Sequence, residues 1–112
     1  AVRRAVVATL RRIGYTVLEA RDGREACARL AEHEGHVHLV VTDTVMPGMN
    51  GMELAAAAAA TRPSTKTLLM YGYAPESLGD IGGAHLAAFL QKPFAPRALA
   101  ALVREVLDAP GR

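Results

Sequence analysis

Residues 37–43, VHLVVTD, decide the fold, because a nearly unbroken run of β-branched and aliphatic side chains ends at an aspartate. Such a run is typical of a parallel strand that helices cover on both faces, whereas a strand with one solvated face alternates apolar and polar residues. The next residues, TVMPGMN at 44–50, form a loop, and Gly51 opens an alanine-rich helix. The unit is therefore strand, loop and helix, with the carboxylate of Asp43 at the end of the strand.

The same alternation of helix and strand extends outward from this unit in both directions. Apolar spacing and turn residues predict helices over residues 2–13, 23–34, 51–61 and 96–108, a short or frayed helix within 74–86, and strands over 16–20, 67–71 and 87–91. Gly14 stands where a left-handed residue would end the first helix. Alternation of this kind builds a right-handed, doubly wound parallel sheet. The sequence thus predicts an α/β fold, with residues 1–112 forming one domain.

Size and composition limit the classes of function. A chain of 112 residues, 51% of them hydrophobic, suits one small domain with a single core. Its thirteen basic and eleven acidic residues are scattered, and nucleic acid binding would need basic residues clustered on one face. No apolar run approaches the length of a signal or membrane segment, so no membrane contact is expected. The single cysteine, Cys27, cannot form an internal disulfide, and a reducing cytoplasm is the expected compartment.

Three residues with reactive side chains follow predicted strands. In an open parallel sheet, reactive groups gather at the carboxyl ends of the strands, and Asp43, Tyr71 and Lys92 occupy that edge. A carboxylate facing a lysine there could be a structural ion pair, and these two residues alone leave that reading open. The loop MPGMNG at 46–51 favours a functional site, because its exposed backbone can present a carbonyl to a cation held by Asp43.

Three stretches carry a resemblance to a known family. LVVTDTVMPGMNGMEL at 39–54 resembles the phosphoacceptor strand and loop of response-regulator receiver domains, and FLQKPF at 89–94 resembles their closing strand with its lysine and proline. RRIGYTVLEARDGREA at 11–26 is similar to the family's first helix, second strand and second helix. The resemblance covers essentially the whole chain. The runs MYGYAPE at 70–76 and KPFAPRALAALVREVLDA at 92–109 look most like receivers at the carboxyl end of hybrid sensor histidine kinases.

The resemblance implies a flavodoxin-like (βα)5 fold and a phosphorelay function. Asp43 would accept a phosphoryl group from a phosphohistidine on a histidine kinase or a histidine phosphotransfer domain, with a kinase core possible upstream in the same chain. Mg²⁺ would be held by Asp43 and the backbone carbonyl of Val45, and Lys92 would pair with the incoming phosphoryl group. Phe89 would be the aromatic switch residue. Such a domain is a signalling phosphoacceptor rather than an enzyme, limited to its own phosphotransfer and dephosphorylation.

The chain departs from the family pattern in two places. The family's opening strand, with the acidic pair that completes the Mg²⁺ site, has no counterpart ahead of residues 1–3. The chain is therefore expected to be an N-terminally truncated receiver, weakly stable, with a slot between residues 16–20 and 37–42. Tyr71 stands where receivers carry Ser or Thr, and its ring would either point to solvent and leave the switch uncoupled or cover the site as a lid.

Two other functions and one metal site compete with this interpretation of the sequence. A pseudo-receiver would keep the fold but act without phosphorylation, as a docking surface through its last strand and helix; Tyr71 favours it, and Asp43 and Lys92 argue against it. A phosphohydrolase of the haloacid dehalogenase type would need a second aspartate two residues after the first, where Val45 stands. The residues His33, Glu34, His36 and His38 are close in sequence, but they are expected to be surface residues rather than metal ligands.

Overall fold

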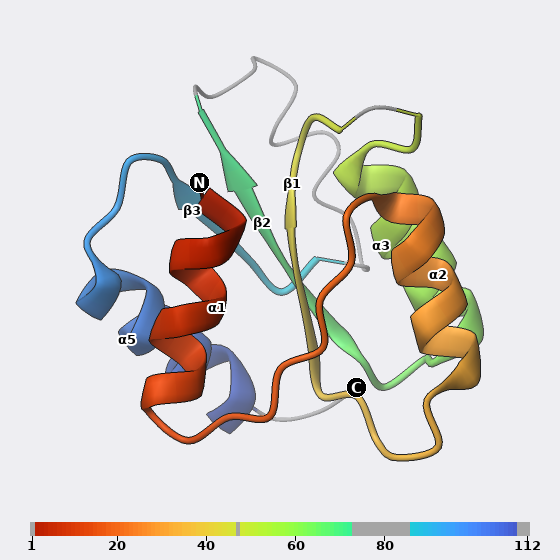
Figure 1. Cartoon of the computed structure of the whole chain (residues 1–112), viewed down its shortest axis with the longest axis horizontal. Helices are drawn as coiled ribbons and strands as arrows, with labels where there is room; N and C mark the ends of the chain where they lie inside the picture. The colour runs from red at the N-terminus through yellow and green to blue at the C-terminus, as the bar shows by residue number, and fades with distance from the viewer. Residues whose placement is uncertain (1, 47, 73–85, 110–112) are drawn as a thin grey trace.

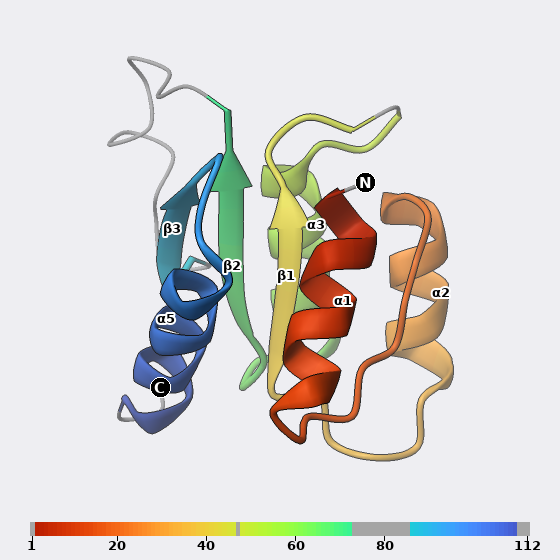
Figure 2. The ribbon, with the colours of Figure 1, turned by 60° about the vertical axis from the view of Figure 1, so that its left-hand side comes forward.

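Three parallel strands form the centre of the molecule in the computed structural model, which describes residues 2–46, 48–72 and 86–109 (Figure 1). The strands are β1 (Leu39–Asp43), β2 (Lys66–Tyr71) and β3 (Ala88–Gln91), and the helices are α1 (Val2–Arg12), α2 (Gly23–Glu32), α3 (Gly51–Thr61) and α5 (Pro96–Asp108). β2 lies in the middle and pairs with both neighbours in parallel register. Helices α1 and α5 cover one face of the sheet, and α2 and α3 cover the other (Figures 1 and 2). The predicted doubly wound α/β fold is therefore confirmed.

The core forms around β2 because this strand has a neighbour on both edges and a helix layer on both faces. Four consecutive residues of β2 are buried, and Leu68 and Leu69, which point to opposite faces, have no exposed surface. On the α1 and α5 face the buried cluster consists of Val6, Leu10, Leu68, Met70, Leu99 and Val103. Each such aliphatic side chain contributes about 1.5–3 kcal/mol through burial. Burial around β2 is thus the main source of stability.

Local signals place the helix ends. Asn50 and Glu53 form a capping box at the start of α3, each side chain accepting the other residue's backbone N–H. Pro96 occupies the first turn of α5, and Gly14 adopts a φ of 106° after α1. Before α2, the backbone N–H of Arg21 donates to the Glu25 carboxylate and lowers the pKa of that group. The bounds predicted for the helices at 51–61 and 96–108 are both confirmed.

The predicted strand at 16–20 was wrong. We call these residues the strap: they are extended, but the structure assigns them no strand. A strand requires a hydrogen-bonded neighbour, and the strap's carbonyls instead accept side-chain hydrogen bonds from α1, Val17 from Arg11 and Ala20 from Arg3. A cavity of about 900 Å³ lies between the strap and β1, at the position of the predicted slot. The predicted helix within 74–86 lies almost wholly outside the described residues, as does His85.

Arg62 joins the two helices on one face of the sheet. Its guanidinium donates three hydrogen bonds to backbone carbonyls, those of Leu30 (2.9 Å), His33 (2.5 Å) and Gly35 (2.8 Å). These carbonyls belong to the last turn of α2 and the chain just beyond it, where carbonyls have no partner within the helix. The arginine therefore fixes the end of α2 and the approach to β1.

Arg62→Lys should lower the free energy of unfolding by about 2 kcal/mol, because one ammonium cannot replace three diverging donors at half-buried carbonyls. Urea unfolding followed by circular dichroism would measure the loss. Arg24→Lys is the matched control, because Arg24 is exposed and has no hydrogen bond or ion pair among the described residues. Equal midpoints for the two variants would contradict the assigned role of Arg62.

Candidate functional site

Asp43 and Lys92 meet at the carboxyl edge of the sheet. The strand register places Asp43 beside Met70 of β2, and Gln91 of β3 beside Tyr71, so the residue after β3 lies close to the end of β1. Lys92 Nζ donates to Asp43 Oδ1 at 2.8 Å across 49 residues of sequence. The side chains are 28% and 35% exposed, respectively, so the pair is sheltered yet open to an incoming group. The two most important predicted site residues are thus brought together.

The loop after Asp43 is held to β2 and α3 by its own backbone. The N–H and the hydroxyl of Thr44 both donate to the carbonyl of Met70 at 2.8 Å. The N–H of Gly51 donates to the carbonyl of Thr44 at 2.9 Å. A Cβ at Gly51 would lie 2.2 Å from the Asp43 carbonyl oxygen and 2.7 Å from Leu69 Cδ1, so only glycine fits. These contacts position the carboxylate of Asp43.

Gly51→Ala should therefore destabilise the protein by about 1–3 kcal/mol, because the added methyl collides with backbone as well as with a core side chain. The midpoint of thermal unfolding would show the change. Gly72→Ala serves as the control, since its Cβ would meet no atom within 4 Å and it does not have a positive φ. Comparable midpoints for both alanine variants would contradict the close approach of the backbone at Gly51.

The other predicted site residues lie at different distances from this pair. Tyr71 ends β2 with a half-buried side chain, and its carbonyl accepts the backbone N–H of Lys92 at 2.7 Å. Phe89 is 36% exposed and lies on the sheet face opposite its neighbours in β3, which pack on the α1 and α5 side. Val45 is 84% exposed in the loop after β1. The structure thus joins Tyr71 to the pair through the backbone, whereas Phe89 lies in β3 on the face of the sheet away from α1 and α5.

The donor set for a magnesium ion is small. Within the described ranges, Asp43 belongs to no group of three His, Cys, Asp or Glu residues that could hold a metal ion. Magnesium prefers six oxygen ligands in octahedral geometry, and one carboxylate with the Val45 carbonyl supplies two. These residues do not fit the ion by themselves.

His36 and His38 stack edge to face with ring centroids 4.3 Å apart on the exposed surface, as predicted for surface histidines.

Sequence reasoning missed two residues that position the site. Gly51 had a signal, because the pattern N-x-x-E at 50–53 places a capped helix start directly after the loop. Thr44 had none, since its acceptor, the Met70 carbonyl, is 26 residues away in sequence. Among the described residues, no helix is long and apolar enough to cross a membrane.

Comparison with known proteins gives consistent matches. The family model of the response regulator receiver domain matches residues 1–104. Sensor kinase CckA of Brucella abortus is 38% identical over 96% of this chain, and the match spans only 12% of that protein. The response regulator receiver protein CpdR of the same organism is 36% identical, and the match covers 96% of this chain and 89% of CpdR. Among solved structures, a CheY-like receiver domain of Methanospirillum hungatei has a TM-score of 0.85 and 29% sequence identity, and the match covers 94% of this chain and 83% of that one. The chemotaxis protein CheY4 of Vibrio cholerae has a TM-score of 0.84 and 30% identity, and the match covers 94% of this chain and 88% of that one.

Proposed function

The chain belongs to the response regulator receiver family, and on that premise we propose that Asp43 is the residue that accepts the phosphoryl group. The fold is the CheY-like, flavodoxin-type fold, and the function is that of a receiver domain in two-component signalling. The observation that carries the assignment to Asp43 is the 2.8 Å contact with Lys92 at the carboxyl edge of the sheet. A partly exposed carboxylate with one fixed cation beside it can meet an anionic donor.

The proposed step is a direct displacement at phosphorus. A carboxylate oxygen of Asp43 attacks the phosphorus of a phosphohistidine, so that a P–O bond forms as the P–N bond breaks. The departing imidazole nitrogen keeps the electron pair of that bond and takes up a proton from water. Lys92 supplies positive charge that offsets the repulsion between the two anions, first beside the carboxylate and then beside the transferred phosphoryl oxygens. The product is an acyl phosphate on Asp43.

Magnesium is the cofactor that membership of the family implies. When bound, it would neutralise charge on the phosphoryl oxygens, with Asp43 and the Val45 carbonyl as the donors that this chain offers. Because two donors are few, the transfer step proposed here depends on Asp43 and Lys92 alone.

The phosphoryl donor we propose is a histidine kinase or a histidine phosphotransfer domain. The matching region is 12% of the sensor kinase CckA, which supports a kinase core in the same polypeptide as this domain. The likeness of residues 92–109 to the carboxyl ends of hybrid kinases supports the same proposal. On this view the domain is a phosphoacceptor whose chemistry is limited to its own phosphorylation and dephosphorylation.

Asp43→Asn should abolish labelling when the chain is incubated with acetyl phosphate and Mg²⁺, because a carboxamide is not a competent nucleophile here. Phosphate that hydroxylamine releases from the protein would be measured, since hydroxylamine cleaves acyl phosphates. Asp22→Asn is the matched control, as asparagine preserves the N-cap of α2. Equal label on both variants would refute Asp43 as the residue that accepts the phosphoryl group.

We further propose that Tyr71 and Phe89 form the conformational switch of the domain. The tyrosine makes the response to phosphorylation weaker than a Ser or Thr at the same position would. A Ser or Thr hydroxyl at the end of β2 would lie close to the backbone, whereas the phenol oxygen lies several ångströms farther out. Because the Tyr71 carbonyl holds the backbone of Lys92, a pull on residue 71 would reach β3 and Phe89 directly.

Tyr71→Thr should therefore increase the change in amide hydrogen exchange that phosphorylation causes in β3 and α5. Tyr71→Phe is the control that keeps the ring and removes only the hydroxyl. Hydrogen exchange with mass spectrometry before and after phosphorylation would compare the variants, and identical changes in Tyr71→Thr and the unchanged chain would remove Tyr71 from the switch.

A further inference from the structure

The loop at 44–50, between β1 and α3, rests on the start of α2 through the side chain of Met49. A Cβ placed on Gly23 would lie 2.9 Å from both Cβ and Sδ of Met49 and 3.0 Å from its Cγ. The methionine therefore lies directly against the backbone of Gly23, the first residue of α2. The thiol of Cys27, one turn further along the helix, lies 3.9 Å from the Met49 sulfur. Met49 thus contacts α2 at two successive turns.

The contact with Met49 explains the glycine at position 23 better than the backbone does. Gly23 does not have a positive φ, so its conformation is open to residues with a side chain. Within a helix, alanine is more favourable than glycine by about 1 kcal/mol. Non-bonded heavy atoms do not approach a Cβ within 3.0 Å, so any side chain at position 23 would push Met49 away. The missing side chain of Gly23 is therefore the space that Met49 fills.

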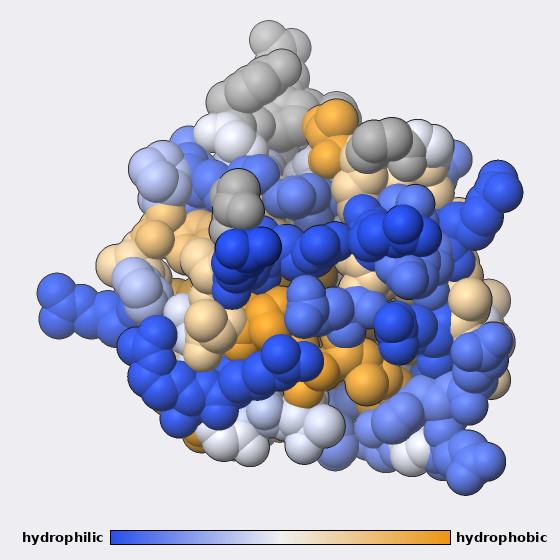
Figure 3. Space-filling model, viewed as in Figure 1, coloured by the Kyte–Doolittle hydropathy of each residue, from blue (hydrophilic) through white to orange (hydrophobic). Residues whose placement is uncertain are grey.

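The first turn of α2 is held by its own hydrogen bonds. Asp22 caps the helix, and its Oδ1 accepts the backbone N–H of Glu25 at 2.9 Å. The Glu25 carboxylate accepts the backbone N–H of Arg21, so the chain is bound on both sides of the cap. Figure 3 shows hydrophilic residues over much of the outer surface of α2, whereas Gly23 is buried. Met49 thus packs against a well-supported, inward part of the helix.

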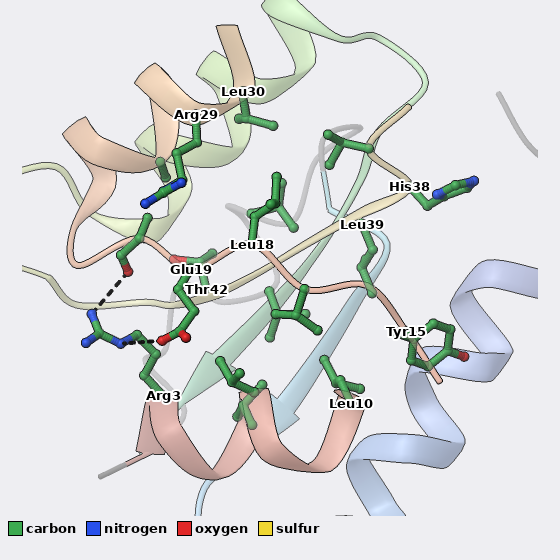
Figure 4. Close-up of a pocket in the computed structure, with 18 of the residues that line it drawn as sticks. Arg3, Leu10, Tyr15, Leu18, Glu19, Arg29, Leu30, His38, Leu39 and Thr42 are labelled. Atoms are coloured by element: carbon green, nitrogen blue, oxygen red, sulfur yellow. Dashed lines mark hydrogen bonds and ion pairs between the residues drawn. The ribbon is translucent and has the colours of Figure 1, made fainter. Parts of the chain in front are cut away.

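The other end of α2 is fixed to the rest of the molecule. Leu30 is buried, and Figure 4 shows it directed from α2 into the cavity beside β1. The guanidinium of Arg62 donates to the Leu30 carbonyl at 2.9 Å. Because α2 is fixed at this end, a loop attached to its first turn is attached to the body of the domain.

The loop that carries Met49 begins directly after Asp43. Hydrogen bonds of Thr44 and Gly51 fix its two ends to β2 and to each other. Val45, just inside the loop, is 84% exposed and contributes little packing. Met49 lies near the other end and adds a contact to α2, which the hydrogen bonds of the ends do not reach. The position of the loop relative to α2 therefore depends on Met49.

We propose that Met49 is a positioning residue for phosphoryl transfer: packed on Gly23, it ties the loop after Asp43 to α2 and holds the carboxylate in its reactive position. This role rests on the proposed function of Asp43. Met49 touches neither the donor nor the phosphoryl group, and it acts through the loop backbone. A small displacement of a reacting group lowers the rate of transfer strongly, because the attacking oxygen must be aligned with the phosphorus.

Met49→Ala and Gly23→Ala should each loosen the loop, the first by removing the side chain and the second by displacing it. Amide hydrogen exchange at Thr44 and Gly51 should become about fivefold faster in both variants, with the amides of β2 unchanged. Labelling by acetyl phosphate and Mg²⁺ should slow by about fivefold at saturating acetyl phosphate, with little change in the half-saturating concentration. Met49→Leu keeps the apolar volume and should retain most of the rate. Met52→Ala, a half-buried methionine of α3, is the matched control.

The double variant separates this role from general destabilisation. Since both changes act on one contact, Met49→Ala combined with Gly23→Ala should label no more slowly than the slower single variant, whereas multiplied losses would overturn the proposal. Label that depends on Asp43 but forms equally fast in Met49→Ala would overturn the role of Met49 and leave that of Asp43 standing. Label that persists in Asp43→Asn would overturn both.

Discussion

The parallel register of the three strands is the constraint on which the site depends. Because β1, β2 and β3 all run the same way, the residues that follow them emerge at a single edge, and a carboxylate and an ammonium 49 residues apart come within 2.8 Å. A change of one residue in this register would reverse which side chains face the helices and would separate Asp43 from Lys92. The packing that fixes β2 therefore also holds Asp43 and Lys92 next to each other.

The three strands are not equally buried and paired. β2 is buried on both faces and paired on both edges, whereas β1, which carries Asp43, has a paired edge towards β2 and the cavity on the other side. Since the cavity lining includes Asp43, the cavity also borders the carboxylate that we propose accepts the phosphoryl group. The open edge of β1 and the edge of the sheet that carries Asp43 and Lys92 thus belong to one region of the molecule.

The predictable parts of the molecule were those that local chemistry decides. The apolar run before Asp43, the proline at the start of α5 and the glycine after α1 each specify a local conformation, and the corresponding elements were placed well from sequence. The strand predicted at 16–20 was wrong because its formation does not depend on local chemistry alone. TVLEA has a strand's composition, but a strand exists only when a neighbouring strand supplies hydrogen bonds. Here arginine side chains of α1 bind the carbonyls instead. No local pattern contains that information.

The sequence by itself determined the α/β order, the position of Asp43 and Lys92 after parallel strands, and the family to which these motifs belong. It did so because apolar periodicity, turn residues and short motifs act over a few neighbouring residues. The tertiary structure alone decided the 2.8 Å distance between Lys92 and Asp43, the attachment of Thr44 to the Met70 carbonyl, and the three hydrogen bonds from Arg62 to the end of α2. Each of these joins groups far apart along the chain, and only the packed sheet and its helices bring them within hydrogen-bonding or van der Waals distance.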